Sequence, residues 1–160
     1  MDEERRTAGD DHGDGEGESA YELLQRGHAL LEARHHAQAA IVLERADRIE
    51  PGKASIIEAL GRAYFNSAQH ELARATFERQ LEIDPSAHYA HFALGQSLKH
   101  LGRREEAGTH LRLAVALSPR TTLYRDALTR LGPTRRDRPT GDGQTTSNSP
   151  SNPATGQSSD

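Results

Sequence analysis

Residues 54–87 read ASIIEALGRAYFNSAQHELARATFERQLEIDPSA, and this stretch decides the fold because its signals recur in the chain at a fixed distance. Each half places apolar residues at helical spacing, so we expect helices over 54–67 and 70–83. Pro85 then ends the unit, since proline lacks an N–H group and pushes the preceding residue out of the helical region. The stretch is therefore a pair of helices joined by a short turn.

The same signals return 34 residues earlier and 34 residues later, which gives copies at 20–53, 54–87 and 88–121. The residues in register are Gly27, Gly61 and Gly95; Ala39, Ala73 and Ala107; Pro51, Pro85 and Pro119; Leu30, Tyr64 and Leu98; Leu43, Phe77 and Leu111; and Ile49, Ile83 and Leu117. A glycine inside a helix costs about 1 kcal/mol relative to alanine. We therefore expect another backbone to pass close to each of the three glycines.

These residues resemble the tetratricopeptide repeat family, whose unit is a helix-turn-helix of 34 residues. The middle copy meets the family pattern best, through Leu60, Gly61, Tyr64, Ala73, Phe77 and Pro85, and the third copy repeats the leucine-glycine pair as Leu94 and Gly95. The chain departs from the pattern at Leu23, Ile57 and His91 in the leading aromatic slot, at Gln80 in the slot of Ala46 and Ala114, and at Arg26. The resemblance implies an all-α superhelical solenoid.

Repeat arrays also need their ends closed, because each unit buries its face on a neighbour. The stretch TTLYRDALTRLGP at 121–133 predicts a seventh, capping helix over 122–131 that Gly132 and Pro133 end. Its expected apolar stripe consists of Leu123, Tyr124, Ala127, Leu128 and Leu131.

The two ends of the chain have compositions that do not support a core. Residues 1–18 are acidic and glycine-rich and 133–160 are rich in Ser, Thr, Pro, Asn and Gly, so we expect disordered tails around a domain at 19–132. Counting Lys and Arg against Asp and Glu gives 2 − 8 = −6 for 1–18 and 15 − 13 = +2 for 19–132. A domain with a net charge this close to zero gives no electrostatic reason to expect nucleic-acid binding.

The remaining composition narrows the class of protein further. The chain has no cysteine, which excludes disulfides and thiolate chemistry, and it has no apolar run approaching the ~20 residues that span a membrane. We expect a cytoplasmic protein without membrane contact. The eighteen arginines against two lysines are typical of a GC-rich bacterial genome.

Histidines and carboxylates are the candidates for metal or catalytic chemistry. His88 and His91 lie one turn apart on an expected helix, but His100 points to the opposite side, and a zinc site needs three or four ligands. His91 stands in a packing slot, and His35, His36 and His70 fall in turns, where we expect surface residues. No phosphate loop or hydrolase motif is present, and Glu105 and Glu106 suit a helix start. We expect no enzyme, cofactor or metal.

The resemblance implies a binding role instead, with the first helix of each pair lining a concave groove for a peptide or helix of a partner protein. The implied groove residues are Tyr21, Leu24, His28 and Leu31; Ser55, Glu58, Arg62, Phe65 and Asn66; and Tyr89, Phe92, Gln96, Lys99 and His100. The alternative is a self-associating protein whose groove is covered by its own capping helix or by a second chain.

One partner class does not fit the resemblance, and one regulatory question stays open. Family members that hold a chaperone C-terminal tail clamp its carboxylates with Lys, Asn and Arg. The matching positions here are Leu24, His28, Ala59, Tyr89 and Ala93, which cannot form that clamp. The acidic tail at 1–18 could fold back and compete for the groove.

Overall fold

The computed structural model describes residues 17–137, within which every regular element is helical. The elements are α1 (Ala20–Glu32), α2 (His36–Ile49), α3 (Ala54–Asn66), α4 (His70–Ile83), α5 (His88–His100), α6 (Arg104–Leu117), α7 (Thr122–Leu131) and the short 3-10 helix η1 (Arg135–Asp137). The all-α fold with seven α-helices that the sequence predicts is confirmed. The tails predicted to be disordered lie outside the described residues, apart from 17–18 and 133–137.

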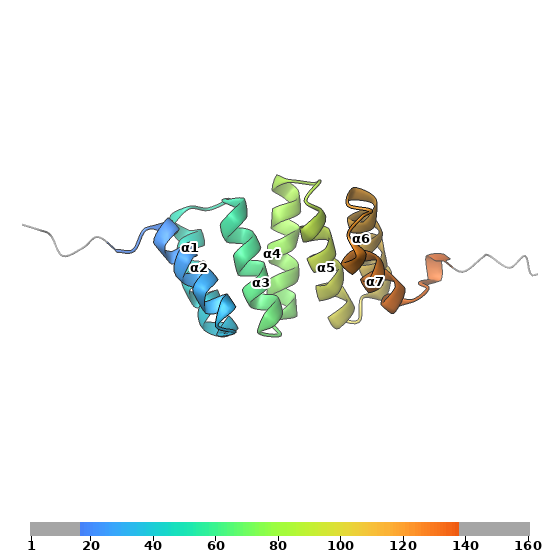
Figure 1. Ribbon diagram of the computed structural model, residues 1–160, viewed down its shortest axis with the longest axis horizontal. Coiled ribbons are helices and arrows are strands. Elements are labelled where there is room, and N and C mark those ends of the chain that lie inside the picture. Colours follow the sequence, from blue (N-terminus) through green and yellow to red (C-terminus); the bar gives the residue numbers. More distant parts are fainter. Residues whose placement is uncertain (1–16, 138–160) are drawn as a thin grey trace, which may run out of the picture.

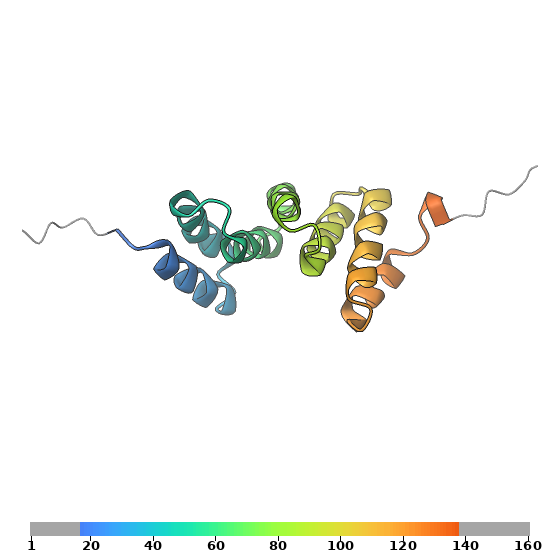
Figure 2. The same ribbon diagram turned by 90° about the horizontal axis from the view of Figure 1, so that it is seen from above.

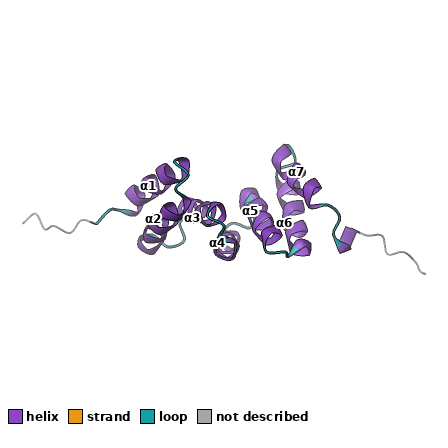
Figure 3. Ribbon diagram, turned by 90° about the horizontal axis from the view of Figure 1, so that it is seen from below, coloured by secondary structure: helices purple, strands orange, loops and turns teal. Residues whose placement is uncertain are grey.

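The helices form an elongated array that follows the order of the sequence (Figure 1). α1 packs on α2, α3 on α4 and α5 on α6, and each pair packs on the next through α2–α3 and α4–α5. Smaller contacts join α1 to α3, α3 to α5 and α5 to α7. The view from above shows the pairs succeeding one another along the long axis (Figure 2). The view from below shows α7 beside α6 at the C-terminal end (Figure 3). Each helix pair therefore buries part of its surface against the next pair.

Each glycine of the repeat register lies under a large side chain of the second helix of its own pair. A Cβ atom on Gly61 would come within 2.7 Å of the Phe77 ring, and one on Gly95 within 2.8 Å of Leu111. Phe77 and Leu111 are fully buried. What comes close to each glycine is thus mainly a side chain, whereas we expected a backbone. A backbone atom also comes close to Gly95, since a Cβ atom there would lie 3.1 Å from the Ala107 carbonyl oxygen.

The turn inside each pair uses one backbone geometry three times. Arg34, Ala68 and Gly102 have φ values of 62°, 61° and 78°, and they are 34 residues apart. After α3, Ala68 N–H donates to the Phe65 carbonyl and Gln69 N–H donates to the Tyr64 carbonyl, at 3.1 and 2.9 Å. This is the Schellman arrangement, which satisfies the last carbonyls of a helix. It turns the chain sharply enough for the second helix to pack back on the first.

The two ends of the array are finished differently. α1 begins with a capping box, in which Glu22 N–H donates to Ser19 Oγ and Ser19 N–H donates to the Glu22 carboxylate. At the other end the chain continues past the predicted boundary at 132. Thr134 is buried on Gly108, and Arg135 N–H donates to the Glu105 carboxylate on α6. The residues 133–137 therefore belong to the folded unit.

Candidate protein-binding groove

The first helices of neighbouring pairs, α3 and α5, enclose a small hollow of about 130 Å³. The second helix α4 supplies its floor, because the buried Phe77 also lines it. The remaining lining residues come from the two first helices, and they are Arg62, Phe65, Asn66, Tyr89, Phe92, Ala93 and Gln96. Six of the residues that the sequence assigned to the groove thus meet at one place.

The other residues assigned to the groove lie outside this hollow. Leu24 and Leu31 are only 7% and 8% exposed and belong to the core, so the first copy offers little apolar surface there. Tyr21 is 62% exposed and His28 and Ser55 are also exposed. The third copy continues past the hollow with the half-buried Lys99 and the exposed His100, and Glu58 is half-buried on α3.

Aromatic rings run from the floor of the hollow to the capping helix. The Tyr89 ring lies edge-on to Phe77 and tilted against Phe92, each with centroids 6.2 Å apart. Phe92 in turn stacks on Tyr124 of α7 at 4.8 Å. The Tyr124 hydroxyl lies 2.8 Å from His88 Nδ1. One side of Phe92, which lines the hollow, is thus covered by Tyr124 of the same chain.

Tyr124 is the residue near the groove that sequence reasoning missed, because it was counted only as part of the packing stripe of α7. The register carries a signal for its position, since Tyr124 follows the buried Ile56 and Ala90 at steps of 34. Within the stripe, Tyr124, Ala127 and Leu131 are buried and Leu128 is half-buried, whereas Leu123 is 50% exposed and does not pack.

The polar groups around the hollow are free to meet a ligand. Among residues 17–137, Arg62 and Lys99 have no carboxylate partner within 4.0 Å, and Glu58 has no cationic one. Burial raises the pKa of the Tyr89 hydroxyl, Arg62 lowers it and Glu58 raises it, so the phenol stays protonated at neutral pH. The site therefore combines apolar rings with hydrogen-bond donors and opposite charges.

The histidines do not converge on a metal site. In the described part of the chain, no group of three or more His, Cys, Asp or Glu side chains is placed to hold a metal ion. His91 is buried in its packing slot, with Nε2 3.0 Å from the Pro85 carbonyl oxygen and Nδ1 3.0 Å from His110 Nδ1. His35 is exposed as expected, but His70 is half-buried and stacks on His100 with ring centroids 4.3 Å apart. The expectation that His36 and His70 are surface residues is wrong, because both are half-buried with an enclosed Nδ1 atom, and the ring of His70 lies against His100 at the end of α5.

An elongated array of packed helix pairs with a hollow between first helices defines a helical repeat solenoid. Two family models, both described as Tetratricopeptide repeat, match residues 30–93 and 88–121. The chain belongs to the tetratricopeptide repeat family, as its sequence predicts. Domains of this family are in general non-catalytic modules of protein interaction.

Relatives and solved structures agree with this family. The chain is 30% identical over 101 residues to Superkiller complex protein 3 of Mus musculus, a match that covers 63% of this chain and 6% of that protein. The human protein of that name is 28% identical over 99 residues, again 6% of its length. The chain therefore corresponds to a small part of these relatives.

Two solved structures share the fold at low identity. MamA from Desulfovibrio magneticus RS-1 superposes with a TM-score of 0.70 at 21% identity, covering 74% of this chain and 67% of that one. The first repeat domain of Spaghetti (RPAP3), bound to the HSP90 peptide SRMEEVD, gives 0.67 at 17% identity, covering 71% and 90%. In residues 17–137 no helix is long and apolar enough to cross a membrane.

Proposed function

We propose that this protein is a non-enzymatic adaptor that binds a peptide or helix of a partner protein in the hollow between α3 and α5. The observation that carries the proposal is the meeting of Phe65, Tyr89 and Phe92 around one concave hollow, beside Arg62, which has no carboxylate partner within residues 17–137. Aromatic side chains and arginine are the residue types that supply most binding energy in protein interfaces. A hollow of about 130 Å³ suits a single apolar side chain as anchor, with the rest of the peptide along the groove.

The partner differs in class from the peptide bound by Spaghetti. At the positions where the family clamps the carboxylates of a chaperone tail, Leu24, Ala59 and Ala93 are buried here. None of these three side chains offers a hydrogen bond to a carboxylate. Of the other two positions, the exposed His28 can make one hydrogen bond and the half-buried Tyr89 carries no charge, so the Lys, Asn and Arg of that clamp have no counterpart. We propose a ligand held by one apolar anchor in the hollow and by polar contacts to Arg62 and Gln96, with an affinity of about micromolar, or about −8 kcal/mol.

The groove is tested by capture from the lysate of the native host with the full chain as bait. The groove variant is Arg62→Ala/Gln96→Ala, since neither side chain makes a hydrogen bond or ion pair within the described residues. The matched control is Arg48→Ala/Glu82→Ala, two exposed residues of α2 and α4 away from the hollow. We expect a partner that the wild type and the control retain and that binds the groove variant at least tenfold more weakly. Equal capture by both variants contradicts the groove.

A self-associating protein is the second candidate, and one row of side chains favours it. Ile49, Ile83 and Leu117 occupy the same register position at the ends of α2, α4 and α6, and they are 52%, 50% and 43% exposed. Their repetition at one register position offers a second chain an apolar side chain on each successive pair. Sedimentation of the full chain over a range of micromolar concentrations tests self-association. A mass that stays at the monomer value at every concentration contradicts it.

A further inference from the structure

Helix α5 carries two histidines that each lie against a histidine of a neighbouring helix. His91, in its first turn, faces His110 on α6, and His100, its last residue, faces His70 on α4. Nine residues separate His91 and His100, which places them on opposite sides of the helix. The two most extensive contacts of α5, with α4 and with α6, therefore each contain a pair of titratable rings.

The hydrogen bonds of the first pair determine where its protons lie. Nε2 of His91 lies 3.0 Å from the Pro85 carbonyl oxygen, which can only accept, so Nε2 carries a proton. In neutral His91 the other nitrogen, Nδ1, is then the acceptor of the 3.0 Å contact with His110 Nδ1, which must donate. One added proton fits on His110 Nε2. A second proton, on His91 Nδ1, would place two N–H groups against each other at the same contact.

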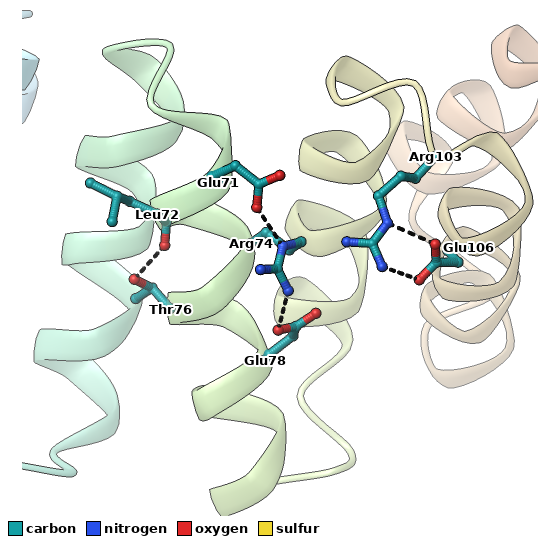
Figure 4. A network of polar contacts seen from close by, with 7 residues as sticks. All are labelled: Glu71, Leu72, Arg74, Thr76, Glu78, Arg103 and Glu106. Carbon is teal, nitrogen blue, oxygen red and sulfur yellow. Dashed lines mark hydrogen bonds and ion pairs between the residues drawn. The ribbon is translucent and has the colours of Figure 1, made fainter.

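Two carboxylates face this pair from neighbouring helices, but both already have cationic partners. Glu78 on α4 lies 2.7 Å from Arg74, and Glu106 on α6 lies 2.7 Å from Arg103 (Figure 4). Burial and the charge of His91 lower the pKa of His110, and the two carboxylates only partly oppose them. The pair therefore resists a double charge.

The second pair resists a double charge for a different reason. The rings of His70 and His100 are nearly parallel, at 10° with centroids 4.3 Å apart, and Phe65 from α3 lies edge-on to both. Nδ1 of His70 is buried without a hydrogen-bond partner in the described structure, so a proton there would have no acceptor. Burial and then the charge of His100 lower the pKa of His70. Two stacked imidazolium rings would repel.

We propose that α5 is an acid-sensitive junction, in which two histidine pairs each hold at most one proton and release α5 from α4 and α6 when more protons bind. In the unfolded chain all four rings accept protons below about pH 6.5. Each pair thus takes up one proton more on unfolding, and stability is lost as pH falls through this value. From pH 7.5 to 5.5 the unfolding constant rises about tenfold for each pair, or about a hundredfold together. This inference does not depend on what the groove binds.

The second copy shows which neutral residues can stand in place of the two rings of the first pair. Ile57 and Thr76 hold the positions of His91 and His110 in the second copy. The variant His91→Ile/His110→Thr/His70→Gln therefore replaces three of the four rings with neutral side chains and leaves only the exposed His100. His70→Gln alone tests the stacked pair, because it removes the ring whose Nδ1 is buried without a partner in the described structure, and His28→Gln replaces an exposed histidine as a control.

The experiment is urea unfolding of the full chain at pH 7.5 and pH 5.5. We expect the hundredfold rise in the unfolding constant for the wild type and the control, about tenfold for His70→Gln, and little change for the triple variant. Equal rises in the wild type and the triple variant overturn the proposal. If the triple variant does not fold, His70→Gln decides, since an unchanged rise in the unfolding constant overturns the proposal. NMR titration of the imidazoles adds a test without substitution, because two charged rings in one intact pair also overturn it.

Discussion

Gly61 shows how one missing side chain organises a helix pair. Because it has no Cβ, the ring of Phe77 fits against α3 and is fully excluded from water. Sequence spacing alone revealed that close approach was needed, but not that a side chain makes it. The ring that fills the space follows 16 residues later, at the same offset as Leu111 from Gly95.

The pairing of Gly61 with Phe77 predicts non-additive effects on stability. Gly61→Ala is expected to lower the free energy of unfolding by about 1–3 kcal/mol through overpacking, and Phe77→Ala by about 3–5 kcal/mol through a cavity. The added methyl group would sit in the space that Phe77 vacates, so the double variant is expected to lose less than the sum. Urea unfolding of the three variants measures this, and simple additivity contradicts the contact.

At the scale of elements, the turn between paired helices uses a left-handed residue that only the third copy fills with glycine. Gly102 adopts a positive φ at little cost, whereas Arg34 and Ala68 adopt it with a side chain. The left-handed conformation costs a residue with a Cβ roughly 1–2 kcal/mol. The first two turns are therefore strained where the third is relaxed.

We expect Ala68→Gly to stabilise the chain by about 0.5–1 kcal/mol, because the relief of backbone strain exceeds the conformational entropy that glycine loses on folding. Ala29→Gly is the matched control, since Ala29 is an exposed residue inside α1 and should lose about 1 kcal/mol there. Thermal or urea unfolding compares the two. A loss of stability at both positions contradicts the turn assignment.

The sequence predicted the elements well because small residues and prolines keep one step through three copies. It could not predict contacts that depend on a single side chain. Phe92 was expected to lie free in the groove, but it stacks on Tyr124, so its truncation will also affect stability. His91 was placed correctly in a packing slot, but its partner His110 has no counterpart of its type in the other copies.

For the molecule as a whole, the C-terminal end of the array is closed by more than the predicted capping helix. Thr134 is only 3% exposed, and its N–H and hydroxyl both donate to the Asp137 carboxylate, which also pairs with Arg112 of α6. The composition of residues 133–137 did not predict that they pack on α6, because they contain no large apolar side chain.

Two truncations test this closure. A chain that ends after residue 137 is expected to melt at the temperature of the full chain, since it keeps every contact of the described structure. A chain that ends after residue 132 loses Thr134 from its place on Gly108 and is expected to lose about 1–2 kcal/mol. Calorimetry measures both. Equal melting temperatures would show that the extension contributes nothing.

The glycine contacts described for each pair also bear on how fast the chain folds. Each closes between residues 16 positions apart, and the next packing step joins a pair only to its neighbour. Closing such short loops costs little entropy, and the cost does not grow as pairs are added. Each helix pair can therefore form through its own contacts before it packs on its neighbour. Folding can start in any copy and proceed from there to the adjacent copies.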